Sequence, residues 1–84
     1  MTISENIEKV LLTEIAVGLE KKSLDPDEDL LEQSIIDSLG LMKLIDFMEK
    51  TFGIKILDEQ IVPENFQSLN SMVKLVEQQM QNNS

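Results

Sequence analysis

The sequence predicts a single small all-α domain, residues 1–84, with three longer helices and one very short one. Apolar residues recur at three- and four-residue spacing in three segments, and helix-capping residues stand before them. The stretch at 54–56 has an extended pattern, but it is too short and has no partner with which to build a sheet. A chain of 84 residues that is 42% hydrophobic has material for one core.

The first helix is expected at about residues 3–20. Thr2 and Glu5 form the pattern of a capping box, in which each side chain bonds the backbone of the other. Lys21 and Lys22 complement the negative end of the helix dipole. One apolar stripe runs along this segment: Ile3, Ile7, Val10, Leu11 and Ile15.

The second helix is expected at about residues 38–52. Asp37 is a favourable N-cap residue, and Gly53 is a typical stop signal. The side chains expected on its buried face are Leu41, Leu44, Ile45, Met48 and Phe52.

The third and fourth helices follow after a short connection. Asp58 can cap a very short helix at about 58–62, which Pro63 should end because its ring interrupts helical hydrogen bonding. Ser68 can cap a final helix at about 69–81. Its expected apolar face consists of Leu69, Met72, Val73, Val76 and Met80.

Composition excludes several classes of function. Without cysteine or histidine, the chain has neither the ligands of a zinc or iron–sulfur site nor the base of a serine-hydrolase triad. The net charge of −9 would repel nucleic acid and anionic lipid, and no apolar run is long enough to span a membrane. We therefore expect no metal, nucleic acid or membrane as partner, and a cytoplasmic location.

The positions of the acidic residues also bear on two further functions, calcium binding and acid–base catalysis. Asp25, Asp27 and Asp29 alternate as in the first half of a calcium-binding loop, but Leu30 then stands where glycine is required and Ile36 where a glutamate must bind the ion. The other carboxylates are scattered over faces expected to be exposed, so the chain is not expected to be an enzyme.

Ser38 is the main candidate functional residue. It follows the cap Asp37 and is expected at the first helical position with its hydroxyl facing outward. Because the chain has no histidine to act as its base, another enzyme would have to modify this hydroxyl. The pattern alone also fits an ordinary exposed serine in a first helical turn.

The chain resembles the acyl and peptidyl carrier proteins. It reads Ile-Asp-Ser-Leu at 36–39, Leu-Ile-Asp-Phe-Met-Glu at 44–49 and Phe-Gly-Ile-Lys-Ile at 52–56. The resemblance implies a four-helix bundle with a short third helix, in which Ser38 carries 4'-phosphopantetheine. It also implies that Asp37 helps the phosphopantetheinyl transferase and its metal ion to engage the site, and that Leu39 is an apolar contact beside it.

Two positions depart from the pattern of the fatty-acid carriers. Gly40 stands in place of the acidic residue that follows their Asp-Ser-Leu motif, and Lys43 stands where another acid is common. The second helix is therefore less acidic than in those carriers, which favours a discrete carrier of a specialised pathway that loads an amino acid or an unusual acyl group.

A prosthetic arm would also supply a thiol, which the chain lacks. The expected partners are the transferase, an adenylating or acyl-transferring enzyme that loads the arm, and downstream biosynthetic enzymes. The chain is expected to be a monomer, which suits a domain that must visit several enzymes. Leu39 and Met42 would contact them, while Asp46 and Glu49 would steer basic partners.

The sequence leaves open an alternative for the exposed face of the second helix and another for the function of the chain. Leu39 and Met42 could simply pack in the core, since a methionine at helical spacing is often buried. The chain could also be a non-covalent helical adaptor, or a degenerate carrier that keeps the fold without modification at Ser38.

Overall fold

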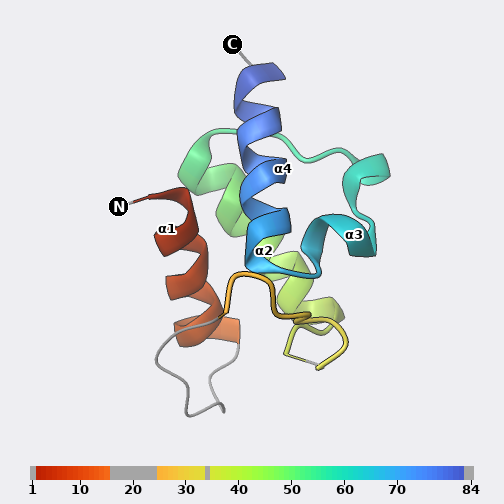
Figure 1. Ribbon diagram of the computed structural model, residues 1–84. Helices are drawn as coiled ribbons and strands as arrows, with labels where there is room; N and C mark the ends of the chain where they lie inside the picture. Colours follow the sequence, from red (N-terminus) through yellow and green to blue (C-terminus); the bar gives the residue numbers. More distant parts are fainter. Residues whose placement is uncertain (1, 16–24, 34, 83–84) are drawn as a thin grey trace.

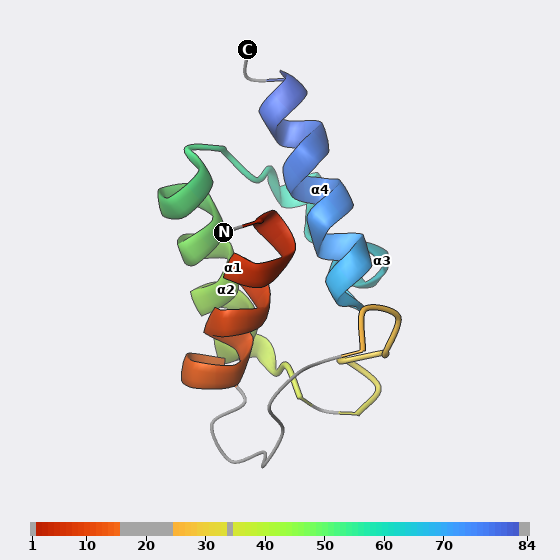
Figure 2. The same ribbon diagram turned by 60° about the vertical axis from the view of Figure 1, so that its left-hand side comes forward.

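The computed structural model describes residues 2–15, 25–33 and 35–82, and these ranges contain helices and no strand. The all-α prediction, a four-helix bundle with a short third helix, is confirmed. Helix α1 runs opposite to α2 and α4, and both α1 and α3 pack against α4 (Figures 1 and 2). The elements in order are α1 (Ile3–Val10), the π-helical η1 (Leu11–Ile15), α2 (Ser38–Phe52), the 3-10 helix η2 (Asp58–Gln60), α3 (Pro63–Phe66) and α4 (Leu69–Asn82).

Helix α1 begins with the expected capping box. The Thr2 hydroxyl accepts from the Glu5 amide at 3.0 Å, and the Glu5 carboxylate accepts from the Thr2 amide at 3.3 Å. The bond from the Thr2 amide, with help from the Thr2 hydroxyl, lowers the pKa of Glu5. After Val10 the helix widens into η1 and remains helical as far as Ile15. Residues 16–20 of the expected first helix, and Lys21 and Lys22, lie outside the described ranges.

Helix α2 has the bounds expected from its capping residues, but the third helix does not. Gly53, at φ 65°, ends α2 in the left-handed conformation that glycine adopts without strain. The short helix expected at 58–62 is only the single 3-10 turn η2, and Pro63 begins α3 instead of ending a helix. Proline suits this first position because an N-terminal N–H has no intrahelical partner to lose.

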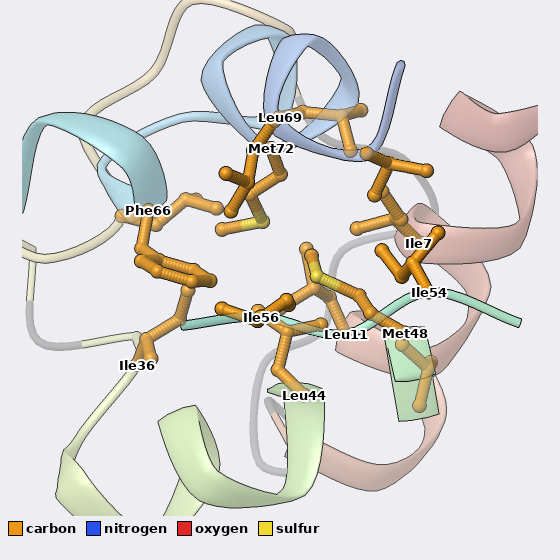
Figure 3. Packing of buried hydrophobic residues seen from close by; sticks show 14 residues of the cluster. Ile7, Leu11, Ile36, Leu44, Met48, Ile54, Ile56, Phe66, Leu69 and Met72 are labelled. Atoms are coloured by element: carbon orange, nitrogen blue, oxygen red, sulfur yellow. The ribbon is translucent and has the colours of Figure 1, made fainter. Parts of the chain in front are cut away.

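One hydrophobic core lies between α1, α2 and α4 (Figure 3). The loop before α2, the segment after it and α3 also contribute side chains to this core. Ile54 and Ile56 contribute to it from the extended segment after α2, while Lys55 between them is exposed. Burial of these apolar side chains is the main stabilising term for a chain of this size. Side chains with at most 2% exposure include Ile7, Leu11, Leu30, Leu44, Met48, Phe66, Leu69, Met72, Leu75 and Val76.

The last turns of α4 bury a different residue from the one expected. Met80 is 44% exposed, whereas its neighbour Gln79 is only 5% exposed. The Gln79 side chain donates to the Lys55 carbonyl and accepts from the Gln60 amide, so both ends of this buried amide are satisfied. The expected face with Leu69, Met72 and Val76 is buried, and hydrogen bonding of Gln79, which apolar spacing does not record, accounts for the difference at the last turns.

The segment before α2 is fastened to the beginning of α4. The Leu30 amide donates to the Gln67 carbonyl, and the Asn70 amide donates to the Pro26 carbonyl at 3.0 Å. The Asn70 side chain also donates to the Asp27 carboxylate at 2.7 Å. The loop lies beside the beginning of α4 (Figure 2), and Leu30 within it is fully buried in the core.

Candidate functional site

Ser38 is the first residue of α2 and is exposed to solvent. The capping role falls to Asp37, whose carboxylate accepts from the Gly40 amide at 2.7 Å. No hydrogen bond in the described part of the chain occupies the Ser38 hydroxyl. The side chain is therefore held on a rigid helix end with its oxygen available to another enzyme.

The backbone on both sides of Ser38 is anchored. Ile36, two residues before it, is buried at 4% exposure, and its amide and that of Ile35 both face the Leu30 carbonyl. Leu41, three residues after it, donates its amide to the Asp37 carbonyl at 2.8 Å. These contacts hold the Ser38 backbone in place relative to the core, while its side chain extends into solvent.

Gly40 is buried where the N-terminal turn of α2 meets η1. A Cβ at this position would lie 2.9 Å from Cγ2 of Ile15 and 3.2 Å from the Asp37 carboxylate oxygen that caps the helix. The acidic side chain that fatty-acid carriers have at this point would meet both groups. Close packing of η1 against α2 therefore accounts for the glycine that departs from the carrier pattern.

Leu39 and Met42 are not core residues. Their exposed fractions are 64% and 70%, so the alternative in which they pack inside the bundle is wrong. Met42 follows Ser38 by four residues, and side chains at this spacing lie on the same side of a helix. Together they form an apolar surface next to the serine.

Asp46 and Glu49 lie further along the exposed side of α2, and each already has a contact. Asp46 pairs with Lys50 at 3.1 Å on the helix surface. Glu49 is half-buried, and its carboxylate accepts from the Ile56 amide at 3.0 Å, which ties α2 to the extended segment that follows it. The contact of Glu49 is thus partly structural.

Sequence reasoning missed Ile61 as a member of this surface. Ile61 is 36% exposed and follows η2, and with side chains of α2 it lines a depression of about 270 Å³. No spacing rule connects it to α2, because their proximity depends on the path of the chain after Gly53. The residues that line this depression are Met42, Ile45, Asp46, Glu49 and Ile61.

The acidic segment before α2 uses its carboxylates in turns. Asp25 accepts from the Asp27 amide at 2.9 Å, and Asp29 accepts from the Glu32 amide at 2.9 Å. Within the described ranges, no three acidic side chains converge as metal ligands would. None of the helices there combines the length and hydrophobicity that a membrane-spanning segment needs.

Fold and site together define a small helical protein with an exposed serine, Ser38, at the first position of its second long helix. Comparison with known families agrees with this. Residues 5–76 match the family described as "Phosphopantetheine attachment site". The chain belongs to this family of carrier proteins, whose members are in general not catalytic and bear 4'-phosphopantetheine on a serine.

Similar proteins include acyl and aminoacyl carriers. The chain is 35% identical to the probable acyl carrier protein PigG of Serratia sp. over 74 residues, which cover 84% of this chain and 85% of PigG. It is 36% identical to an acyl carrier protein of Nitratidesulfovibrio vulgaris over 70% of this chain and 75% of that protein. It is also 35% identical to the D-alanyl carrier protein of Streptococcus pyogenes over 62% of this chain and 66% of the relative.

Proposed function

We propose that Ser38 is the residue that carries the phosphopantetheine arm, and that the chain tethers an acyl or aminoacyl group as a thioester on it. The observation that carries this proposal is the exposed Ser38 hydroxyl at the start of α2, directly after the cap Asp37. Ser38 lies within the matched residues 5–76. The site fits the group, since the hydroxyl is uncovered and Asp37, not Ser38, caps the helix.

The chain's own part in the chemistry is positional. A transferase would join the Ser38 oxygen to the phosphate of phosphopantetheine as the pyrophosphate bond of coenzyme A breaks, with adenosine 3',5'-bisphosphate as the leaving group and the hydroxyl proton released. The arm would supply the thiol that the chain lacks. Tethering raises the local concentration of the intermediate at each enzyme that the carrier visits. The chain would supply no catalytic group to these reactions.

Asp37 would have a second role besides capping. Its carboxylate lies directly before the serine and is exposed, so it can also attract the metal ion that the transferase brings. Leu39 and Met42 would provide the nonpolar contact with partner enzymes, because both are exposed beside Ser38. Asp46 and Glu49 would add to the steering of basic partners, to an extent that their contacts with Lys50 and Ile56 restrict.

The partners of such a carrier would be the phosphopantetheinyl transferase, an adenylating or acyl-transferring enzyme, and the enzymes that use the loaded group. The relatives are named both as acyl carriers and as a D-alanyl carrier, which supports cargo from either chemical class. We place the protein in the cytoplasm, where coenzyme A is available, and propose a monomer because one small exposed face must serve several enzymes in turn.

The first test is the intact mass of the protein after incubation with coenzyme A and a broad-specificity phosphopantetheinyl transferase. The wild type should gain one phosphopantetheine, and Ser38→Ala should gain none. Circular dichroism should show that Ser38→Ala is folded, since Ser38 is exposed and Asp37 provides the cap. A wild type that gains no mass, while a known carrier domain is modified in parallel, would contradict the proposal and favour an unmodified adaptor.

A further inference from the structure

Gly40 is the buried residue in the first turn of α2, and Ile15 at the end of η1 faces it. A Cβ at position 40 would lie 2.9 Å from Cγ2 of Ile15, whereas real Cβ atoms essentially never approach another heavy atom to less than 3.0 Å. Ile15 therefore fills the space that a side chain at position 40 would need. The start of α2 and the end of η1 are packed together through the absence of that side chain.

The same side of Gly40 also faces the cap of the helix. A Cβ there would lie 3.2 Å from the Asp37 carboxylate oxygen that accepts from the Gly40 amide at 2.7 Å. Of these two neighbours the carboxylate moves more easily, because Cγ2 of Ile15 is attached directly to a β-branched carbon whose χ1 rotation is restricted. A methyl group at position 40 would therefore push the Asp37 carboxylate away from the amide that it caps.

Displacement of this carboxylate would change the state of the Ser38 hydroxyl. Serine is itself a favoured cap residue, and a capping hydroxyl accepts from a backbone amide two or three residues later. Ser38 as the cap would use the Leu41 amide, which in the structure donates to the Asp37 carbonyl at 2.8 Å. The helix would then begin one residue later, and the Ser38 oxygen would be occupied.

We propose that Gly40 is a positioning residue for the modification of Ser38. By leaving room for Ile15 and for the Asp37 carboxylate together, it holds the start of α2 at Asp37 and keeps the Ser38 hydroxyl free for the transferase. Gly40 is buried and acts through Asp37. This inference rests on the proposed function and adds to it a residue that lies behind the site, on the side of η1.

The test measures kcat and KM for modification with coenzyme A and a broad-specificity phosphopantetheinyl transferase. Gly40→Ala should lower kcat by about five-fold, the factor expected when a helix cap is lost, and should change KM little. Ile15→Ala is the matched control: it should be modified at the wild-type rate because the cap is intact, although lost packing lowers its midpoint of urea unfolding. The double variant, Ile15→Ala with Gly40→Ala, should recover the wild-type kcat, since removal of Cγ2 makes room for the new methyl group.

Amide exchange provides a second measurement, on the wild type itself. The Gly40 amide should be better protected against deuterium exchange than the Leu39 amide, for which the described part of the chain provides no acceptor. If circular dichroism shows that Gly40→Ala is unfolded, this exchange and the double variant decide.

Three results would each overturn the positioning role while full modification of the wild type left the proposed function intact. They are equal protection of the Gly40 and Leu39 amides, a Gly40→Ala variant as fast as the wild type, and a double variant slower than Ile15→Ala. Complete absence of modification at Ser38 in the wild type would overturn both the positioning role and the proposed function.

Discussion

Asp37 and Ser38 are neighbours in the first turn of α2, yet their side chains have different tasks. The Asp37 carboxylate is engaged with the Gly40 amide, and the Ser38 hydroxyl is left available. This division is what makes the serine usable, because a serine that capped the helix itself would have its oxygen occupied by backbone N–H groups.

Substitutions at Asp37 can separate its capping role from its charge. Asp37→Ala should lower the free energy of unfolding by about 1 kcal/mol, because the first turn of α2 loses its cap. Asp37→Asn should keep stability within about 0.5 kcal/mol of the wild type, because asparagine caps as well as aspartate. Urea denaturation measures both values.

The rate of phosphopantetheine loading then reports on the carboxylate itself. Asp37→Asn should load more slowly than the wild type, since it lacks the negative charge proposed to attract the metal ion of the transferase. Equal loading rates for Asp37→Asn and the wild type would show that the charge has no part in the modification.

The residues of the site differ in how far the sequence alone could predict them. Asp37 as cap and Ser38 as exposed serine follow from local pattern, and the structure has both. The exposure of Leu39 and Met42 was one of two open interpretations, since helical spacing does not say which face is covered. The bond of Glu49 to the Ile56 amide could not be predicted, because it depends on how the chain turns at Gly53.

At the scale of elements, the connection between α2 and α4 is held by polar contacts as well as by the core. Gln79 on α4 reaches both Gln60 of η2 and the carbonyl of Lys55. Glu49 on α2 bonds the amide of Ile56 in the same segment. The extended stretch after α2 thus has side-chain partners on two helices, which compensates for the lack of a sheet.

Replacement of the buried glutamine should reveal the weight of this network. Gln79→Leu should lower the free energy of unfolding by about 1–3 kcal/mol, because the Lys55 carbonyl and the Gln60 amide lose a partner in a part-buried place. Gln78→Leu is the matched control, an exposed neighbour on the same helix whose replacement should change stability by less than about 0.5 kcal/mol. Equal midpoints of thermal unfolding for the two variants would refute a stabilising role for the network.

Helix starts were easier to predict than the short third element. Thr2, Asp37 and Ser68 each accept a backbone N–H three residues later, so side-chain chemistry marks the beginning of α1, α2 and α4. Pro63 is ambiguous, because proline both interrupts a preceding helix and favours the first position of a new one. The burial of Phe66 in the core, together with the hydrogen bond from the Asn65 side chain to the Gln60 carbonyl, favours the second outcome.

At the scale of the whole molecule, charge is distributed unevenly. The five acidic residues between 25 and 32 have no basic residue among them, whereas α2 is neutral. Such a distribution keeps the molecule strongly anionic, while the surface beside Ser38 combines the exposed Leu39 and Met42 with the single carboxylate of Asp37. The net charge and the charge balance of α2 could both be counted from the sequence, but the exposure of Met42 and its proximity to Ile61 required the structure.

The anionic charge should make stability depend on salt. Like charges repel more strongly in the compact state, so screening should stabilise the fold, and we expect the midpoint of thermal unfolding to rise by a few degrees, about 2–5 °C, between about 20 mM and about 500 mM NaCl. Potassium chloride should act equally, because screening does not depend on the identity of the cation. A midpoint that stays constant or falls would contradict the expectation.

The fastening of the loop before α2 has a consequence for the biosynthesis of the protein. Leu30 and Pro26 bond to Gln67 and Asn70, so the approach to Ser38 is set by residues that the ribosome adds some thirty positions later. A nascent or truncated chain that ends before α4 contains Ser38 but lacks the hydrogen bonds that Asn70 makes to the loop before α2. If Ser38 bears the arm, we expect the arm to be attached after α4 has folded, and a chain that ends before α4 to be modified more slowly than the full chain.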